Sequence, residues 1–189
     1  MTIRLVLPLG AMLAIAMAAT PSVAQAPKSA PSAGKAAPET PKVERLRESQ
    51  YWSAFAETGK GGKACYLVGR PQKSEPANLK RGDVRVFVTH RPAEKSYNVV
   101  NFAAGYPYKE GSEVELMVDA RKFALFTSKE GAWARDATID KAIVEAMAKG
   151  KQVVLKGTSA RGTATTDTYA LAGFAQALGE IDKACGVKR

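Results

Sequence analysis

The sequence has very few of the side chains that metal sites and catalytic triads require. It contains one histidine and two cysteines in 189 residues. A closed zinc site takes four Cys or His ligands and a catalytic one usually three, so these numbers exclude most zinc sites. The single histidine, His90, allows at most one base of the kind used in a Ser-His-Asp triad. We therefore expect no metal and no cofactor.

Long apolar runs are also missing after the first 24 residues. Residues 1–24 are typical of a secretory signal peptide, with Arg4 in a basic start and an apolar run over Leu5–Ala19. Small residues at Ser22 and Ala24 predict cleavage after Ala24. An uncleaved anchor is the alternative, but the run is short for the roughly 20 residues that a bilayer requires. The sequence predicts an exported mature chain without a membrane-spanning helix.

Residues 25–49 have little apolar side-chain area. Up to about Val43 they are almost entirely Ala, Pro, Lys, Ser, Gly and Thr, which do not offset the entropy cost of ordering. This composition predicts a disordered linker, acting either as a tether or simply as an exposed tail. Val43–Gln50 is predicted to form one or two helical turns at most.

Residues 50–189 have the pattern of a globular, mainly β domain. Apolar residues alternate in Val84–Thr89 and Val114–Val118, which is the period of a β-strand. In Tyr97–Ala104 they occupy odd and even positions alike, which is typical of a more central strand. Apolar stripes with helical spacing occupy Thr138–Lys149 and Gly173–Ala184. Many short strands with two helices predict an antiparallel β-sandwich or barrel-like domain that the helices cover.

The two cysteines lie near opposite ends of this domain. An exported chain with two thiols most simply forms one disulfide, so we predict a bond between Cys65 and Cys185. It would close a loop of about 120 residues, for which chain entropy gives roughly 5 kcal/mol as an upper figure. A redox-active pair is the alternative, but no C-x-x-C spacing supports it.

Basic residues outnumber acidic ones, giving a net charge of +10. Residues 50–189 hold 22 basic and 15 acidic residues, so most of the excess belongs to the folded domain. This predicts salt-sensitive binding to an envelope protein or an anionic surface, either lipid or lipopolysaccharide. Specific nucleic-acid binding is not expected, because no aromatic–basic motif is evident. The alternative is a solvated face. The candidate binding residues are Lys80, Arg81, Arg85, Arg91 and Arg161. Strand alternation puts Arg81, Arg85 and Arg91 on one face if the strand begins early enough to include Arg81.

A loop rich in hydroxyl groups joins the last two predicted strands. The segment Lys156–Tyr169 lacks the G-x-x-x-x-G-K-[ST] pattern of nucleotide hydrolases. Its Ser and Thr side chains either satisfy the loop's own backbone or help to hold an anion. An enzymatic alternative to binding is a hydrolase that uses His90 with a hydroxyl of Thr158–Thr168.

Several longer motifs stand out in residues 50–189. They are Arg81-Gly82-Asp83, Phe87–Pro92, Ala104–Pro107, Gly157–Thr163, Gly173-Phe174 and Ala184–Gly186. Together they resemble the invasion associated locus B family, and the resemblance covers about residues 50–187. It implies an exported periplasmic or outer-envelope protein of alphaproteobacteria, linked in some pathogens to host-cell invasion. Cys65 and Cys185 match family cysteines, and the family offers no catalytic residues to transfer.

Overall fold

A computed structural model describes residues 40–189 of the chain, which form one antiparallel sheet and two α-helices. The strands lie in the order β1-β2-β3-β5-β6-β9-β8-β7-β10-β11-β4. The predicted mainly β, antiparallel class with two helices is confirmed. Within this part of the chain, no helix is long and apolar enough to cross a membrane. The elements are β1 (Lys42–Glu48), β2 (Trp52–Gly59), β3 (Gly62–Gly69), β4 (Lys73–Glu75), β5 (Arg85–Arg91), a 3-10 turn (Pro92–Glu94), β6 (Ser96–Ala103), β7 (Glu113–Val118), β8 (Arg121–Ser128), β9 (Gly131–Trp133), α1 (Ala137–Lys149), β10 (Gln152–Thr158), β11 (Ala164–Ala170) and α2 (Phe174–Cys185).

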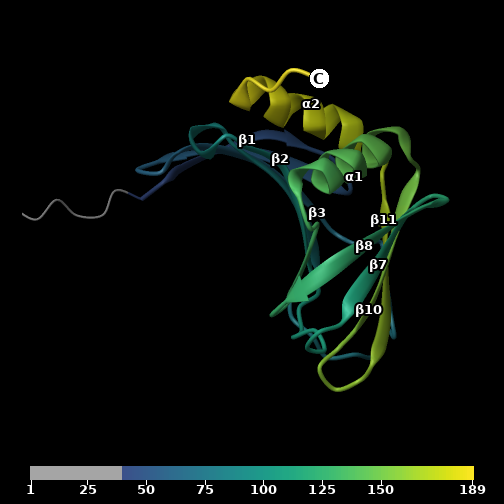
Figure 1. Cartoon of the computed structure of the whole chain (residues 1–189). Helices are drawn as coiled ribbons and strands as arrows, with labels where there is room; N and C mark the ends of the chain where they lie inside the picture. Colours follow the sequence, from purple (N-terminus) through teal and green to yellow (C-terminus); the bar gives the residue numbers. More distant parts are fainter. Residues whose placement is uncertain (1–39) are drawn as a thin grey trace, which may run out of the picture. The chain divides into compact units, whose positions relative to one another are not determined.

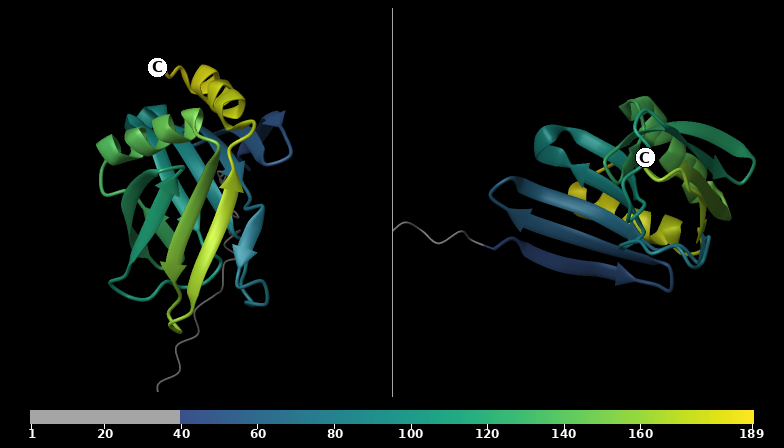
Figure 2. Two further views of the ribbon diagram at one scale, coloured as in Figure 1. Left: turned by 90° about the vertical axis from the view of Figure 1, so that its right-hand side faces the viewer. Right: turned by 90° about the horizontal axis from the view of Figure 1, so that it is seen from below.

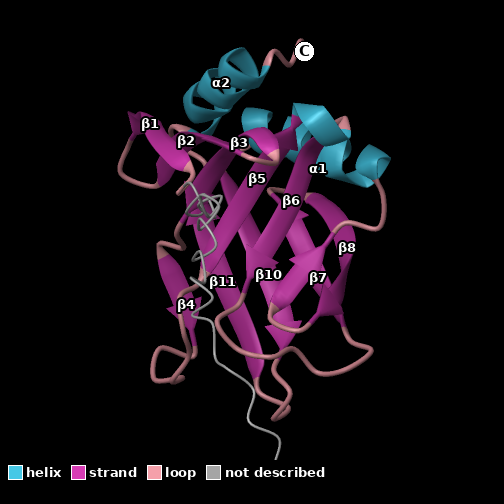
Figure 3. Cartoon of the chain, turned by 90° about the vertical axis from the view of Figure 1, so that its left-hand side faces the viewer, coloured by secondary structure: helices cyan, strands magenta, loops and turns pink. Residues whose placement is uncertain are grey.

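The sheet curves strongly, so that β7, β10 and β11 face the middle strands as an opposite wall (Figures 1 and 3). Both helices lie at the same end of the strands, and the turn between β10 and β11 lies at the other end (Figure 2, left). α2 packs on β2 and β3, whereas α1 packs on β6. The helices thus cover one end of a barrel-like sheet, as the alternation of strand and helix patterns predicts.

Both helices lie within one residue of the ranges that their apolar stripes predict. The Asp136 carboxylate accepts hydrogen bonds from the backbone N–H groups of Thr138 and Ile139, which caps the start of α1. Gly186 ends α2 with a φ of 67°, a left-handed conformation that favours glycine. The apolar stripes are buried as expected: Ile143, Val144 and Met147 in α1, and Phe174, Ala177, Leu178 and Ile181 in α2.

Trp52 joins three elements of the core. Its side chain is 1% exposed, and its ring meets that of Phe174 edge to face with centroids 4.8 Å apart. The indole Nε1–H donates to the carbonyl of Ala170 at 2.8 Å, so the buried polar atom is satisfied. A Cβ at Gly69 would lie 2.5 Å from this ring, which explains why β3 has glycine there. β2, α2 and the end of β11 are therefore fixed to one another.

The predicted disulfide between Cys65 and Cys185 is confirmed. Cys65 is fully buried in β3, and Cys185 is the last residue of α2. The bond thus attaches the C-terminal helix to the strand beneath it.

The segment predicted as one or two helical turns, Val43–Gln50, is instead mostly β-strand. Residues Lys42–Glu48 form β1, which pairs antiparallel with β2, with a shift of register between Arg45 and Arg47. Pairing with the free edge of β2 gives the backbone N–H and C=O groups of β1 hydrogen-bond partners, most of which a single helical turn would leave without one. The last part of the predicted linker is therefore a β-strand. The predicted signal peptide and the linker up to residue 39 lie outside the described residues.

Candidate functional site

One predicted binding residue, Arg81, is not on the surface. Its guanidinium donates to both carboxylate oxygens of Asp167, at 3.0 and 2.5 Å, and the two side chains are only 6% and 2% exposed. The same guanidinium lies 5.8 Å from the centre of the Tyr106 ring. The expectation that Arg81 shares an exposed face with Arg85 and Arg91 is therefore wrong, because a buried carboxylate holds it in the interior.

Lys80 and Arg161 come together at a different place. Both side chains are exposed, and they border a hollow of about 300 Å³ that Tyr106 and Ser159 also line. Arg85 and Arg91 do not line this hollow. The structure thus places Arg81 in the interior and separates the other predicted binding residues into two groups.

The hydroxyl-rich loop is a hairpin turn whose hydroxyl groups form hydrogen bonds with the backbone of the loop itself. The Ser159 hydroxyl accepts a hydrogen bond from the Thr163 N–H. The Ser159 backbone N–H in turn donates to the Thr163 carbonyl at 2.9 Å. Thr165 donates to the carbonyl of Gly157. These bonds match the first of the two sequence interpretations, in which the side chains serve their own backbone.

His90 is buried and both of its ring nitrogens are engaged. Nδ1 accepts the backbone N–H of Asn98 at 3.0 Å, which leaves Nε2–H to donate to Asp182 at 3.0 Å. Arg189 holds the same carboxylate from the other side. Burial lowers the pKa of His90 despite the hydrogen bond to Asp182. The imidazole is therefore a neutral structural group.

This geometry removes the base from the predicted hydrolase. His90 is 0% exposed and contacts α2, whereas the turn from β10 to β11 lies at the other end of the strands (Figure 2, left). No hydroxyl of Thr158–Thr168 can use an imidazole that already has two partners elsewhere. Among residues 40–189, no group of three His, Cys, Asp or Glu side chains could hold a metal ion.

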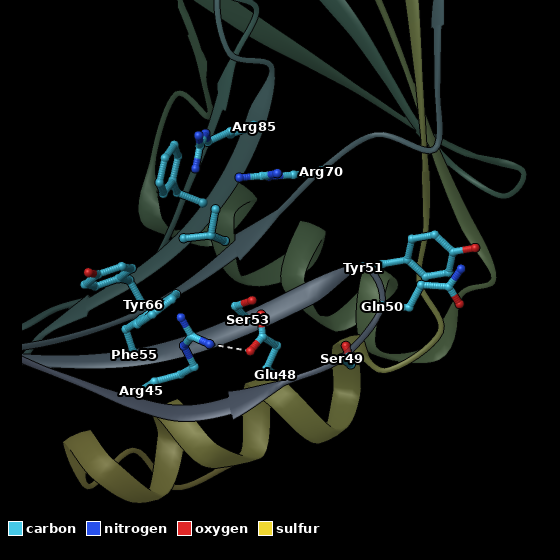
Figure 4. A pocket seen from close by; sticks show the side chains of 12 residues that line it. Arg45, Glu48, Ser49, Gln50, Tyr51, Ser53, Phe55, Tyr66, Arg70 and Arg85 are labelled. Atoms are coloured by element: carbon cyan, nitrogen blue, oxygen red, sulfur yellow. Dashed lines mark hydrogen bonds and ion pairs between the residues drawn. The ribbon is translucent and has the colours of Figure 1, made fainter.

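Another hollow lies on a face of which the sequence interpretation identified only Arg85. It has a volume of about 500 Å³ and lies over β1, β2, β3 and β5, on the side turned away from α2 (Figure 4). The rings of Phe55 and Tyr66 stack there, with centroids 5.3 Å apart and planes 23° apart. The side chains that line it are Arg45, Glu48, Ser49, Gln50, Tyr51, Ser53, Phe55, Tyr66, Val68, Arg70, Arg85 and Phe87.

Strand alternation builds this surface. Ala54, Cys65 and Val86 are buried on the inner face of their strands, which leaves their neighbours on the outer one. Phe55 is the cross-strand partner of Tyr66. A second hollow of about 400 Å³ continues the surface toward Arg91 and shares Tyr66 and Phe87 with the first. We call the surface formed by Phe55, Tyr66, Phe87, Asn101 and Trp133 the aromatic face.

A family model described as invasion associated locus B (IalB) protein matches residues 52–182. The chain belongs to this family. The match runs from the start of β2 into α2, so it includes every residue of the aromatic face of this IalB-family domain. No curated protein and no solved structure matches the chain.

Four arginines and two acids, Glu48 and Glu57, line the two hollows of the aromatic face of the IalB-family domain. Arg45 lies over the Phe55 ring at 5.8 Å and pairs with Glu48, while Arg85 pairs with Asp83 at 2.6 Å. Arg70 is exposed and forms no ion pair with any acid among residues 40–189. The ion pairs are solvent-exposed and therefore weak, so an incoming anion can compete with their carboxylates.

The sequence contained a signal for this face that alternation alone does not resolve. β2 begins with the sequence Trp-Ser-Ala-Phe-Ala-Glu. Because successive side chains of a strand point to opposite faces of the sheet, Phe55 lies on one face and Ala54 and Ala56 lie on the other. Usually the large apolar residue is the buried one. Here α2 packs on β2 and β3 from the side of the small residues, and the aromatic side chains stay half-buried on the outer face.

Proposed function

We propose that this protein is exported to the cell envelope and acts there as a non-enzymatic binding protein for an anionic partner. Membership of the IalB family supports an envelope role, and a structural disulfide suits an oxidising compartment outside the cytosol. The signal-like residues 1–24 agree with this route.

The single observation that carries the proposal is the group of arginines that line the aromatic face together with its aromatic rings. Arg45, Arg70 and Arg85 line one hollow of about 500 Å³ together with the stacked rings of Phe55 and Tyr66. A guanidinium matches carboxylate and phosphate geometry with two parallel hydrogen bonds and is more weakly hydrated than an ammonium group. The hollow therefore offers both charge and apolar contact to an anion.

Salt dependence tests the proposal. The Debye length falls from about 10 Å at 0.1 M salt to about 3 Å at 1 M, so retention on anionic liposomes or lipopolysaccharide should be lost over that range. We expect the double variant Arg85→Glu/Arg91→Glu to lose retention already at 0.1 M salt, because it places acids beside both hollows of the aromatic face.

The matched control is Lys80→Glu/Arg161→Glu, which changes the net charge equally but lies at the other hollow. Retention of this control like the wild type would place binding on the aromatic face. Equal weakening of both variants would mean that net charge alone drives attachment. Retention that is indifferent to salt in all three proteins would overturn the proposal.

A further inference from the structure

We propose that the ligand of the aromatic face is a phosphorylated oligosaccharide, recognised through its sugar rings and phosphates and not through acyl chains. The inference rests on the proposed function for the location of the site and goes beyond it in the chemistry of the ligand. Three features of the face carry it: the layout of the rings, the arginines at its border, and the lack of protruding apolar groups in its hollows.

The aromatic rings that line the first hollow come from three neighbouring strands, β2, β3 and β5. Phe55 of β2 stacks with Tyr66 of β3, and Phe87 of β5 lies beside them as a lining residue of the same hollow. Because Phe55 and Tyr66 stack, their facing sides cover each other, and the ring surface left for a ligand is the outer side of Tyr66 together with Phe87 and Trp133. The apolar C–H face of a sugar ring can lie on an aromatic face, whose π-system carries negative charge.

The aromatic face extends across β6 and β9 through residues that are cross-strand partners. Phe87 is the partner of Asn101, and Asn101 is the partner of Trp133. Both line the second hollow, but the Asn101 amide nitrogen is buried and has no hydrogen-bond partner in the described part of the chain. The Trp133 ring therefore adds an aromatic surface beyond the first hollow, which suits a ligand longer than a single small anion.

Arginines border the aromatic face where the phosphates of such a ligand would lie. Arg70 has no acidic partner among residues 40–189, and Asp83, which pairs with Arg85, is itself 79% exposed. Phosphate accepts the two parallel bonds of a guanidinium and carries more charge than the exposed carboxylates that it would displace. This arrangement favours a phosphorylated sugar over a neutral one.

The surface lacks the features that insert into a bilayer. The large apolar side chains that are exposed in residues 40–189 are Val43, Tyr97 and Phe126, and none of them lines either hollow. Both helices bury their apolar stripes in the domain. A helix that binds the membrane interface would instead expose such a stripe. Contact with acyl chains is therefore not what this face provides.

The experiment measures binding of the purified protein to three probes by titration calorimetry. They are fully deacylated rough lipopolysaccharide, which keeps sugars and phosphates, the same oligosaccharide after dephosphorylation, and phosphatidylglycerol vesicles. We expect binding of the first probe, a loss of about tenfold or more on dephosphorylation, and weaker binding to the vesicles. Tenfold corresponds to about 1.4 kcal/mol, within the range of a charge-assisted hydrogen bond.

Variants locate the binding on the aromatic face. Tyr66→Ala should weaken binding of the phosphorylated oligosaccharide about tenfold, because it removes a ring that lines both hollows, while Tyr66→Phe should retain it. Tyr97→Ala is the control, because this exposed tyrosine lies outside both hollows. Thermal melting of each variant shows whether it is folded, and Arg70→Gln provides a second test on an exposed side chain.

The outcomes separate this inference from the proposed function. Vesicle binding without oligosaccharide binding, equal affinity for the dephosphorylated probe, or an equal effect of Tyr66→Ala and Tyr97→Ala would overturn the inference and leave an anion-binding role standing. Equally tight binding of polyglutamate would also overturn it, in favour of an acidic peptide. Loss of salt-sensitive binding to every anionic probe would overturn both.

Discussion

The Arg81 guanidinium and the Asp167 carboxylate form a two-point ion pair in the interior, across 86 positions of the sequence. The pair links the segment before β5 to β11, on the opposite wall of the curved sheet. Burial raises the pKa of the neighbouring Tyr106, whose hydroxyl hydrogen-bonds with Thr165. The barrel-like interior thus has a polar centre as well as an apolar one.

We predict that removing one partner of this pair is costly. Asp167→Ala leaves the Arg81 charge buried without its counter-ion, and such changes typically cost about 3–5 kcal/mol. The apolar double variant Arg81→Met/Asp167→Leu should recover most of that loss. Urea unfolding of the wild type, Arg81→Met, Asp167→Leu and the double variant gives the coupling energy. Strictly additive single losses would show that the pair does not act as a unit.

The disulfide between Cys65 and Cys185 should contribute a substantial share of the stability. Cys185→Ser is expected to lower the free energy of unfolding by about 2–5 kcal/mol, because the bond closes a loop with a sequence separation of 120 residues. Intact mass with and without reductant, on protein isolated from its native compartment, reports whether the bond forms. An unchanged melting temperature in Cys185→Ser would contradict this structural role.

Local patterns in the sequence predict the fold well where the signals are strong. The apolar stripes and caps of α1 and α2 are visible in the residues, as are the alternating strands of the middle of the chain. β1 and the three-residue β4 were missed, because their order comes from pairing with β2 and β11 and not from their own composition. Such edge strands are determined by tertiary contacts that a window of residues does not contain.

The candidate site was predicted less well, and for a physical reason. Net charge and clustering identified Arg85 and Arg91, which border the aromatic face, but also Arg81, whose buried partner lies 86 residues away. Arg45 and Arg70 were missed, because only the register of the sheet brings them to the same hollow. The aromatic residues were missed because alternation fixes two faces without saying which one α2 covers.

His90 should make the domain sensitive to acid. Its folded-state pKa lies below the ordinary value of 6.5, so the unfolded chain binds the proton more readily. Stability is then fully present above about pH 6.5 and is lost as pH falls toward the folded pKa. His90→Gln keeps an acceptor for the Asn98 N–H and a donor for Asp182 but does not titrate. Urea unfolding between pH 5 and 7.5 should show a shallower loss in this variant, and identical slopes would refute the assignment.

Asp140 should act in the opposite direction. Burial raises its pKa from 3.8 to about 6, although the carboxylate accepts a hydrogen bond from the Val100 N–H. Between these pH values the folded protein binds the proton more readily than the unfolded chain. Stability therefore falls as pH rises from about 4 to 6, and the deficit stays constant above that.

Asp140→Asn keeps the acceptor for Val100 and removes the ionisation. We expect it to be more stable than the wild type by about 1–3 kcal/mol at pH 7.5 and about equal to it at pH 4, since one pKa unit corresponds to about 1.4 kcal/mol. The control on the same helix is Glu145→Gln, because Lys141 lowers the pKa of that exposed carboxylate and gives the opposite dependence on pH. Urea unfolding at the two pH values measures the difference in the free energy of unfolding. If Asp140→Asn is more stable than the wild type by the same amount at pH 4 and at pH 7.5, then ionisation of the Asp140 carboxyl group does not destabilise the folded protein.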